Sequence, residues 1–195
     1  MTSEPSILQA VSNRYAAIGD DPSQEMSIPV GRDWATRLGY PKVLLDTAPA
    51  TALDAFTGIG VPILQAGLSV GETVLDLGCG GGLDTILAAE LVGETGHVHG
   101  VDLASGMVKR ASQAVEETGC RNVTIQRAAA DSLPLEHESI DVTLINGLFN
   151  LTPNKASVVQ EVHRVLRPGG RVVGSEIVIT DGQPAADPDL ESWFR

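Results

Sequence analysis

The segment VLDLGCGGG at residues 74–82 combines a run of glycines with an acidic side chain. Glycine lacks a β-carbon and tolerates positive φ angles, so such a loop can turn sharply after a buried strand. It can also present bare N–H groups beside the positive end of a following helix, which favours an anionic or carbonyl group. Asp76 stands two residues before Gly78, at the entrance of the loop. We therefore also expect a cation nearby.

Two common nucleotide-binding loops are excluded by this spacing. The dinucleotide pattern GxGxxG requires glycine at position 83, where Leu83 stands, and the phosphate-binding ending GK[ST] does not follow. S-adenosylmethionine matches better, because it has an ammonium group for a carboxylate, a carboxylate for backbone N–H groups, and a ribose. The alternative, for the glycine motif alone, is a strand-to-helix turn whose glycines only allow close packing.

A second acidic residue, Asp102, ends the segment HVHGVD, whose apolar alternation predicts a strand. It lies 20 residues after Gly82, where an acid can accept hydrogen bonds from both ribose hydroxyls. Aspartate is also a common helix N-cap, but Ser105 is able to cap the helix that follows. We therefore interpret Asp102 as a ribose-binding residue.

With these blocks in this order, the chain resembles the class I S-adenosylmethionine-dependent methyltransferases over about residues 71–180. The further blocks are GVDLASGMV, SLPLEHESIDVTLIN and VLRPGGRVV. The resemblance implies that the methionine moiety is held by Asp76, Gly78, Cys79, Gly80 and Gly82. It also implies that the ribose and adenine are contacted by Asp102, Leu103 and Met107, and the sulfonium by Asn146 and Gly147. The family often has GDA or GDI after its third strand, where this chain has Ala128, Ala129 and Ala130. We expect adenine to be recognised there by backbone or by Asp131.

A narrower resemblance is to the arsenite methyltransferase-like, or methyltransferase type 11-like, branch. It is carried by FTGIGVP at residues 56–62 and NLTPNK at residues 150–155. Arsenite needs soft thiolate ligands. The positions where that branch places cysteines hold Ile59 and Gly147, and Cys79 and Cys120 do not match them. We therefore expect a small-molecule acceptor with a carbon, nitrogen or oxygen nucleophile, bound near Phe149 and Asn150.

The elements that would position these residues are strands alternating with helices. Apolar runs predict strands over residues 73–77, 97–101, 123–127, 140–145 and 171–179, and helical spacing predicts helices over 83–92, 106–118 and 154–166. This alternation is typical of a parallel sheet between two helical layers. The expected fold is a three-layer, Rossmann-like α/β domain with strand order 3-2-1-4-5. Functional residues should gather at the carboxyl ends of the strands, where the direction of strand addition switches.

Three regions are expected along the chain: a helical cap over residues 1–70, the cofactor-binding core over 71–180 and a short tail over 181–195. In the cap, residues 3–18 predict an amphipathic helix with Ser3 as its cap and Gly19 as its end, followed by short helices over 34–38 and 49–56. The aromatic residues of the cap either shape the acceptor pocket or belong to the core. The tail leaves no room for the family's sixth and seventh strands, which suggests a fragment, or a homodimer formed through the edge of the fifth strand.

Composition narrows the classes of function further. The 195 residues carry a formal charge of −12, which disfavours nucleic acid as a partner. The two cysteines have no metal-ligand companions, so no metal site is expected, and the lack of a long apolar run or a secretion signal favours the cytoplasm. Methyl transfer needs alignment more than an acid or base, so no catalytic residue is assigned. The alternatives are a non-catalytic S-adenosylmethionine-binding module and, less favoured because of Leu83, a nucleotide-binding oxidoreductase.

Overall fold

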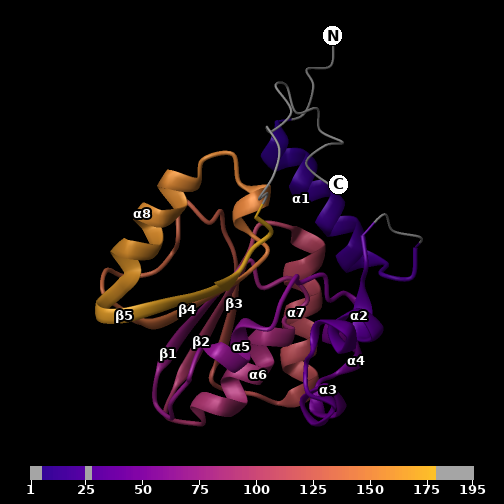
Figure 1. Cartoon of the computed structure of the whole chain (residues 1–195), viewed down its shortest axis with the longest axis horizontal. Coiled ribbons are helices and arrows are strands. Elements are labelled where there is room, and N and C mark those ends of the chain that lie inside the picture. Colours follow the sequence, from indigo (N-terminus) through magenta and orange to yellow (C-terminus); the bar gives the residue numbers. More distant parts are fainter. Residues whose placement is uncertain (1–5, 25–27, 179–195) are drawn as a thin grey trace.

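The computed structural model describes residues 6–24 and 28–178, which form a parallel sheet between layers of helices (Figure 1). All strand pairs are parallel, and the order is β3-β2-β1-β4-β5. The strands are β1 (Thr73–Leu77), β2 (His97–Asp102), β3 (Val123–Arg127), β4 (Ile140–Asn146) and β5 (Leu166–Ser175). This confirms the α/β class and the strand order expected from the sequence.

Helices cover both faces of this sheet. Alternate residues of the strands point to opposite faces, so Val74 packs with α6 (Leu83–Val92) and α5 (Pro62–Gln65), while Leu75 packs with α8 (Lys155–Val165). Right-handed crossovers explain the division, because the chain moves outward in one direction from β1 to β3 and in the other from β4 to β5. The third crossover helix, α7 (Ser105–Thr118), packs on β2 and β3.

The direction of strand addition reverses between β1 and β4, which lie side by side in the sheet. In open α/β sheets a crevice forms at the carboxyl ends of the strands on either side of such a reversal. The loop after β1 and the residues that end β4 therefore face the same crevice. This is the place that the sequence predicted for the functional residues.

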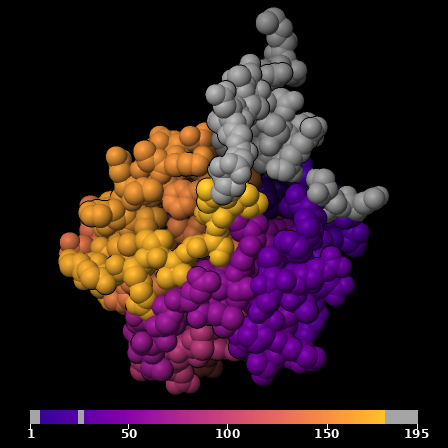
Figure 2. All heavy atoms as spheres, viewed as in Figure 1, coloured from indigo at the N-terminus to yellow at the C-terminus, as the bar shows by residue number. Residues whose placement is uncertain are grey.

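Besides α5, the residues before β1 form α1 (Ile7–Asp20), α2 (Gly31–Leu38), α3 (Lys42–Thr47) and α4 (Ala50–Asp54). The short α3 and α5 were not expected, and α2 begins before the predicted residue 34. In the view of Figure 2 these helices occupy one side of the molecule and α8 with β5 the opposite side. Within the described residues, no helix is long and apolar enough to cross a membrane.

The first helix differs from its prediction at both ends. It begins after Ser6, whose hydroxyl accepts a hydrogen bond from the backbone N–H of Gln9 at 3.3 Å, while Ser3 lies outside the described residues. It also continues through Gly19 to Asp20. The reason is close packing against α7, since a β-carbon at Gly19 would collide with the backbone of Gly106. Gly19 is thus a packing residue and does not end the helix.

The fifth strand begins five residues earlier than predicted. Leu166 pairs with Ile140 and Arg171 pairs with Val142, so a bulge in β5 accommodates the RPGG sequence that suggested a turn. The strand ends at Ser175. Residue 179, its predicted end, and the expected tail over 181–195 lie outside the described residues.

Candidate cofactor site

The glycine loop between β1 and α6 adopts the conformation that its sequence predicted. Gly78, Gly80 and Gly82 have φ angles of +79°, +52° and +90°, a region that favours glycine. Several N–H groups of the loop, however, already donate hydrogen bonds within the protein, mainly to β2. Those of Gly78 and Cys79 donate to the carbonyl oxygen of Val101 at 2.8 and 3.0 Å, and that of Gly82 donates to the carbonyl oxygen of Cys79 at 2.9 Å. These donors are therefore not bare, which corrects the expectation from the sequence. Their hydrogen bonds fix the shape of the loop.

Asp102 lies beside this loop at the end of β2. Its Oδ2 accepts a hydrogen bond from Gly80 N at 2.9 Å, and its Oδ1 accepts one from Ala104 N at 2.8 Å. Burial raises the pKa of its carboxyl group. Ser105 is not the cap of α7, since Ala104 holds the cap position without a side-chain bond. Asp102 thus orders the start of α7 and still lines the cleft described next.

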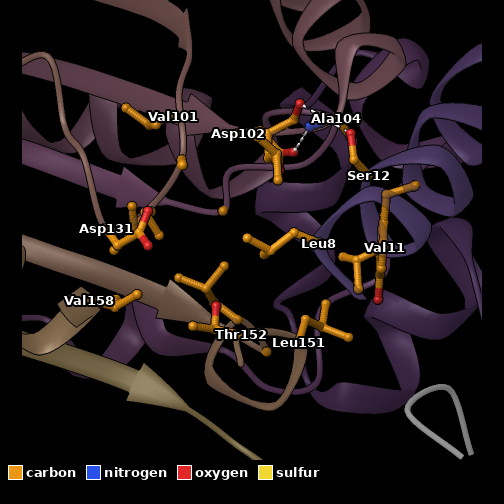
Figure 3. A pocket seen from close by; sticks show the side chains of 18 of the residues that line it. Leu8, Val11, Ser12, Val101, Asp102, Ala104, Asp131, Leu151, Thr152 and Val158 are labelled. Atoms are coloured by element: carbon orange, nitrogen blue, oxygen red, sulfur yellow. Dashed lines mark hydrogen bonds between the residues drawn. The ribbon is translucent and has the colours of Figure 1, made fainter. Parts of the chain in front are cut away.

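A cleft opens at the carboxyl ends of the strands, with about 1000 Å³ of empty space that is partly open to solvent (Figure 3). Its walls come from the glycine loop, from the segments that follow β2, β3 and β4, and from α1. Leu8 projects from α1 into the middle of the cleft, between Asp102 and Thr152 (Figure 3). Asp102 and Asp131 are the only charged side chains among the described residues that line it. The cleft is therefore largely apolar, with two acidic side chains in its wall.

Most of the residues expected around ribose and adenine meet in this cleft. Leu103 and the segment 128–131, which includes Ala129, Ala130 and Asp131, contribute to its wall. The N–H of Ala128 donates to the carbonyl oxygen of Asp102 at 3.1 Å, which holds this segment beside β2. Met107 lies elsewhere: it is fully buried in a cluster with Ile18 and does not line the cleft.

A second, smaller cavity adjoins the cleft, with about 370 Å³ of empty space that is partly open to solvent, and two buried carboxylates line it. Asp76 is 2% exposed and accepts a hydrogen bond from the hydroxyl of Thr85 at 2.5 Å. Asp84 is 5% exposed and accepts hydrogen bonds from the hydroxyl of Tyr40 at 2.7 Å and from Asn146 Nδ2 at 3.0 Å. Asp84 was missed by the sequence analysis. Its signal is the acid at the second position of α6, a helix that is otherwise apolar on nearly every side.

The electrostatics of this smaller cavity favour a cationic ligand. Burial raises the pKa of both Asp76 and Asp84. The negative charges of Asp84 and Asp102 raise the pKa of Asp76 further. Neither carboxylate takes part in the ion pairs of Asp46, Glu72, Asp141 and Glu161 with lysine and arginine side chains. Buried charges are costly unless they are paired. A ligand ammonium group would supply the missing partner. The described residues contain no cluster of three or more potential metal ligands.

The residues that end β4 form the boundary between the two cavities. Asn146 lines both of them, and Gly147 lines the larger cleft. Phe149 and Asn150, the expected acceptor residues, do not contribute to either wall. They bond instead to the segment after β5: Phe149 N donates to Glu176 Oε1 and Asn150 Nδ2 donates to the carbonyl oxygen of Ile177. Their neighbours in the chain line the cleft instead: Leu148, Leu151 and Thr152.

The two cysteines lie at opposite ends of the parallel strands. Cys79 follows the carboxyl end of β1 and is 8% exposed, and burial raises the pKa of its thiol. Its sulfur lies close to Gly100 of β2, since a β-carbon added there would be 3.3 Å from it. Cys120 precedes the amino end of β3. Because the strands are parallel, the two thiols cannot bind one arsenic atom together.

Comparison with known proteins identifies the family. Residues 68–195 match the family model described as a methyltransferase domain. The chain belongs to this family. It is 37% identical to an arsenite methyltransferase of Halobacterium salinarum over 93% of the chain and 50% of that protein. It is 40% identical to a demethylmenaquinone methyltransferase of Anoxybacillus flavithermus over 53% of the chain and 44% of that protein. The chain thus spans about half the length of the curated relatives that it matches, and the resemblance expected from its motifs is confirmed.

Solved structures agree with this assignment. The arsenic(III) S-adenosylmethionine methyltransferase of Chlamydomonas reinhardtii is 34% identical, with a TM-score of 0.58 over 76% of this chain and 49% of that one. The [4+2]-cyclase SpnF is 19% identical, with a TM-score of 0.63 over 88% of this chain and 60% of that one. The second likeness concerns the fold alone. Since the fold also occurs in a cyclase, an activity has to be argued from the site.

Proposed function

We propose that this chain binds S-adenosylmethionine and catalyses methyl transfer to a small organic acceptor. The observation that carries the proposal is the pair of buried acids, Asp76 and Asp84, in a cavity that opens into a cleft containing Asp102. The cofactor carries an ammonium group at one end and a ribose with adenine at the other. The two cavities match this distribution, because the unpaired carboxylates suit the cation and Asp102 suits the ribose hydroxyls.

The residues fit the rest of the cofactor as well. The positive φ angles of the glycine loop bring its backbone to the boundary of both cavities, where Gly78 and Gly80 leave room that side chains would fill. Segment 128–131 offers backbone groups and Asp131 to a purine. When bound, the cofactor would supply a methyl group on a positively charged sulfur, which is a good leaving group. The chain itself would contribute alignment of the acceptor and exclusion of water.

The acceptor class follows from the part of the cleft that the proposed cofactor groups do not occupy. This part is formed by Leu8, Val11 and Tyr15 of α1 together with Leu148 and Leu151. No lysine, arginine or histidine of the described residues lines it, and the chain carries a formal charge of −12. Phosphorylated and carboxylated acceptors would lack a partner there. We therefore propose an uncharged, largely apolar molecule with a carbon, nitrogen or oxygen nucleophile.

Arsenite is disfavoured as the acceptor of this chain, although its relatives include arsenite methyltransferases. Arsenic(III) binds thiolates. Cys79 is buried against β2, while Cys120 lies at the opposite end of the strands. The positions where the sequence resemblance placed cysteines, residues 59 and 147, are in contact but hold isoleucine and glycine. Neither residue offers a thiolate to a metalloid.

The proposal is tested in two steps with the 195-residue chain. Calorimetric titration with S-adenosylmethionine, S-adenosylhomocysteine and NAD is expected to show micromolar binding of the first two and none of the third. An acceptor panel of quinols, phenols and amines, with arsenite plus glutathione as a further member, is then scored by release of S-adenosylhomocysteine. Turnover of arsenite alone would overturn the acceptor class. Binding without turnover of any member would instead favour a cofactor-binding module, and NAD binding would favour an oxidoreductase.

A further inference from the structure

The side-chain amide of Asn146 is the meeting point of two segments far apart in the sequence. Its Oδ1 accepts hydrogen bonds from the N–H groups of Ile59 and Gly60 at 2.9 and 3.0 Å. Its Nδ2 donates to the carbonyl oxygen of Gly60 at 3.1 Å and to Asp84 Oδ2 at 3.0 Å, and lies 3.3 Å from the hydroxyl of Tyr40. One amide thus joins the segment before α5 to a buried acid of α6.

Residues 57–60, here termed the strap, are built to lie against the end of β4. A β-carbon at Gly58 would be 2.5 Å from Asn146 Nδ2, and one at Gly60 would collide with the side chain of Ser175. The indole N–H of Trp34 donates to the carbonyl oxygen of Gly58 at 2.7 Å. The strap therefore depends on two glycines for its close approach and on side-chain hydrogen bonds for its position.

The strap crosses the place where the two cavities meet. Thr57 and Asn146 line both cavities, as do Gly78 and Gly80 of the glycine loop on the other side. If ammonium and ribose bind in the two cavities as proposed, the sulfur that joins them lies at this junction. The position of the strap then sets the shape of the space in which the methyl group is transferred.

We propose that Asn146 is a positioning residue that couples occupation of the acidic cavity to the position of the strap. The inference rests on the proposed function, since the ligand is the cofactor ammonium group. An ammonium group near Asp84 favours the ionised carboxylate, which is the form that accepts hydrogen bonds from both Asn146 and Tyr40. Ligand binding therefore strengthens the bonds that hold the strap. By linkage, a strap that is already held strengthens ligand binding to the same extent.

The coupling is tested with S-adenosylhomocysteine, which retains the ammonium group and cannot react. Amide hydrogen exchange of Ile59 and Gly60 reports on the strap without any ligand, and calorimetry reports on affinity. Asn146→Ala is expected to accelerate exchange at these two amides and to weaken affinity, each by about tenfold, since it removes hydrogen bonds to backbone and to a charged group. In the wild type, the ligand is expected to slow exchange at both amides, and this response should be lost in the variant.

The matched control is Asn122→Ala, which removes another amide that bonds to backbone. Asn122 Nδ2 donates to the carbonyl oxygens of Ala89 and Gly93 at the end of α6, far from the carboxyl edge of the strands. It is expected to lower stability without changing strap exchange or affinity. Asp84→Asn keeps the size of the side chain that Asn146 contacts but cannot ionise. It should leave exchange without ligand unchanged and abolish the response of exchange to ligand, which provides a second test if Asn146→Ala does not fold.

The outcomes separate this inference from the proposed function. If the wild type binds S-adenosylhomocysteine but Asn146→Ala changes neither exchange nor affinity, the coupling is overturned and the function stands. If the wild type binds no ligand while Asn146→Ala still accelerates exchange, the proposed function fails and the coupling fails with it. Asn146 then has only the structural role of holding the strap. Faster exchange together with weaker binding, absent in Asn122→Ala, supports the coupling.

Discussion

Asp102 Oδ2 lies 2.9 Å from the backbone nitrogen of Gly80, so the end of β2 and the glycine loop after β1 share one hydrogen bond. The bond orients the carboxylate while its other oxygen is held by Ala104 N at 2.8 Å. A carboxylate fixed in this way is prepared to receive hydroxyl groups without further ordering. This preorganisation is an advantage in binding, because less conformational entropy is lost when the ligand arrives.

Asp102→Ala is therefore expected to weaken S-adenosylhomocysteine binding by at least about tenfold. The lost interactions are hydrogen bonds to a charged group, each about 1.5–3 kcal/mol. Calorimetric titration measures the change directly. The matched control is Asp33→Ala, which removes an exposed carboxylate of α2 and should leave the affinity unchanged. Equal affinity of the Asp102 variant and the wild type would remove Asp102 from the ribose site.

The buried acids predict an opposite pH dependence for stability and for binding. Burial raises the pKa of Asp76 above its ordinary value, so the folded state binds this proton more tightly than the unfolded chain does. The free energy of unfolding should then fall as pH rises above about 4, the ordinary pKa of aspartate, until the folded carboxyl ionises. A cationic ligand favours the ionised form, so its affinity should increase with pH over the same interval.

Urea unfolding and ligand titration at several pH values between 5 and 8 check this prediction, because the change of the unfolding free energy with pH reports the protons bound on folding. Asp76→Asn is the informative variant, because it keeps the shape and an acceptor for Thr85 but cannot ionise. Its stability should depend less on pH than that of the wild type. An unchanged slope in this variant would assign the pH dependence to other groups.

The contact between α1 and α7 predicts that alanine in place of Gly106 destabilises the protein, although helix propensity alone favours alanine over glycine. A β-carbon at Gly106 would collide with the carbonyl group of Ala16. Gly106→Ala is expected to lower the free energy of unfolding by about 1–3 kcal/mol, the usual cost of overpacking, although alanine favours helices by about 1 kcal/mol over glycine. Urea unfolding measures it. Ser105→Ala, on the exposed side of the same helix, is the control and should stay close to the wild type.

The same glycine contact shows why part of the structure could not be predicted from the sequence. The pattern of apolar runs located the sheet, because strand burial depends on local side-chain alternation. Gly19 was taken as the end of a helix, since the residue that requires its small size, Gly106, lies far away in the sequence. The start of β5 was placed too late for a similar reason, because the pairing of Leu166 with Ile140 compensates for the RPGG turn signal.

The candidate site shows the same division. Asp76 and Asp102 were found because each lies at or near the carboxyl end of a strand and at a motif position. Asp84 was missed because its partners, Tyr40 and Asn146, come from segments 44 and 62 residues away. Phe149 and Asn150 were expected at the cleft from their place after β4, but the 3-10 turn over Phe149–Leu151 directs Leu151 there instead. Which side chain of a short turn faces a cavity depends on tertiary contacts.

The position of Leu8 predicts how α1 controls the volume of the cleft. Its side chain projects into the space between Asp102 and Thr152 (Figure 3), so a larger side chain there competes with ligand for the same volume. Leu8→Trp is expected to weaken S-adenosylhomocysteine binding by about tenfold or more, the equivalent of about 1.4 kcal/mol. Asn13→Trp adds the same indole to the exposed face of α1 and should leave the affinity unchanged. If both variants bind as the wild type does, the side chain of Leu8 does not limit the volume that the cofactor occupies.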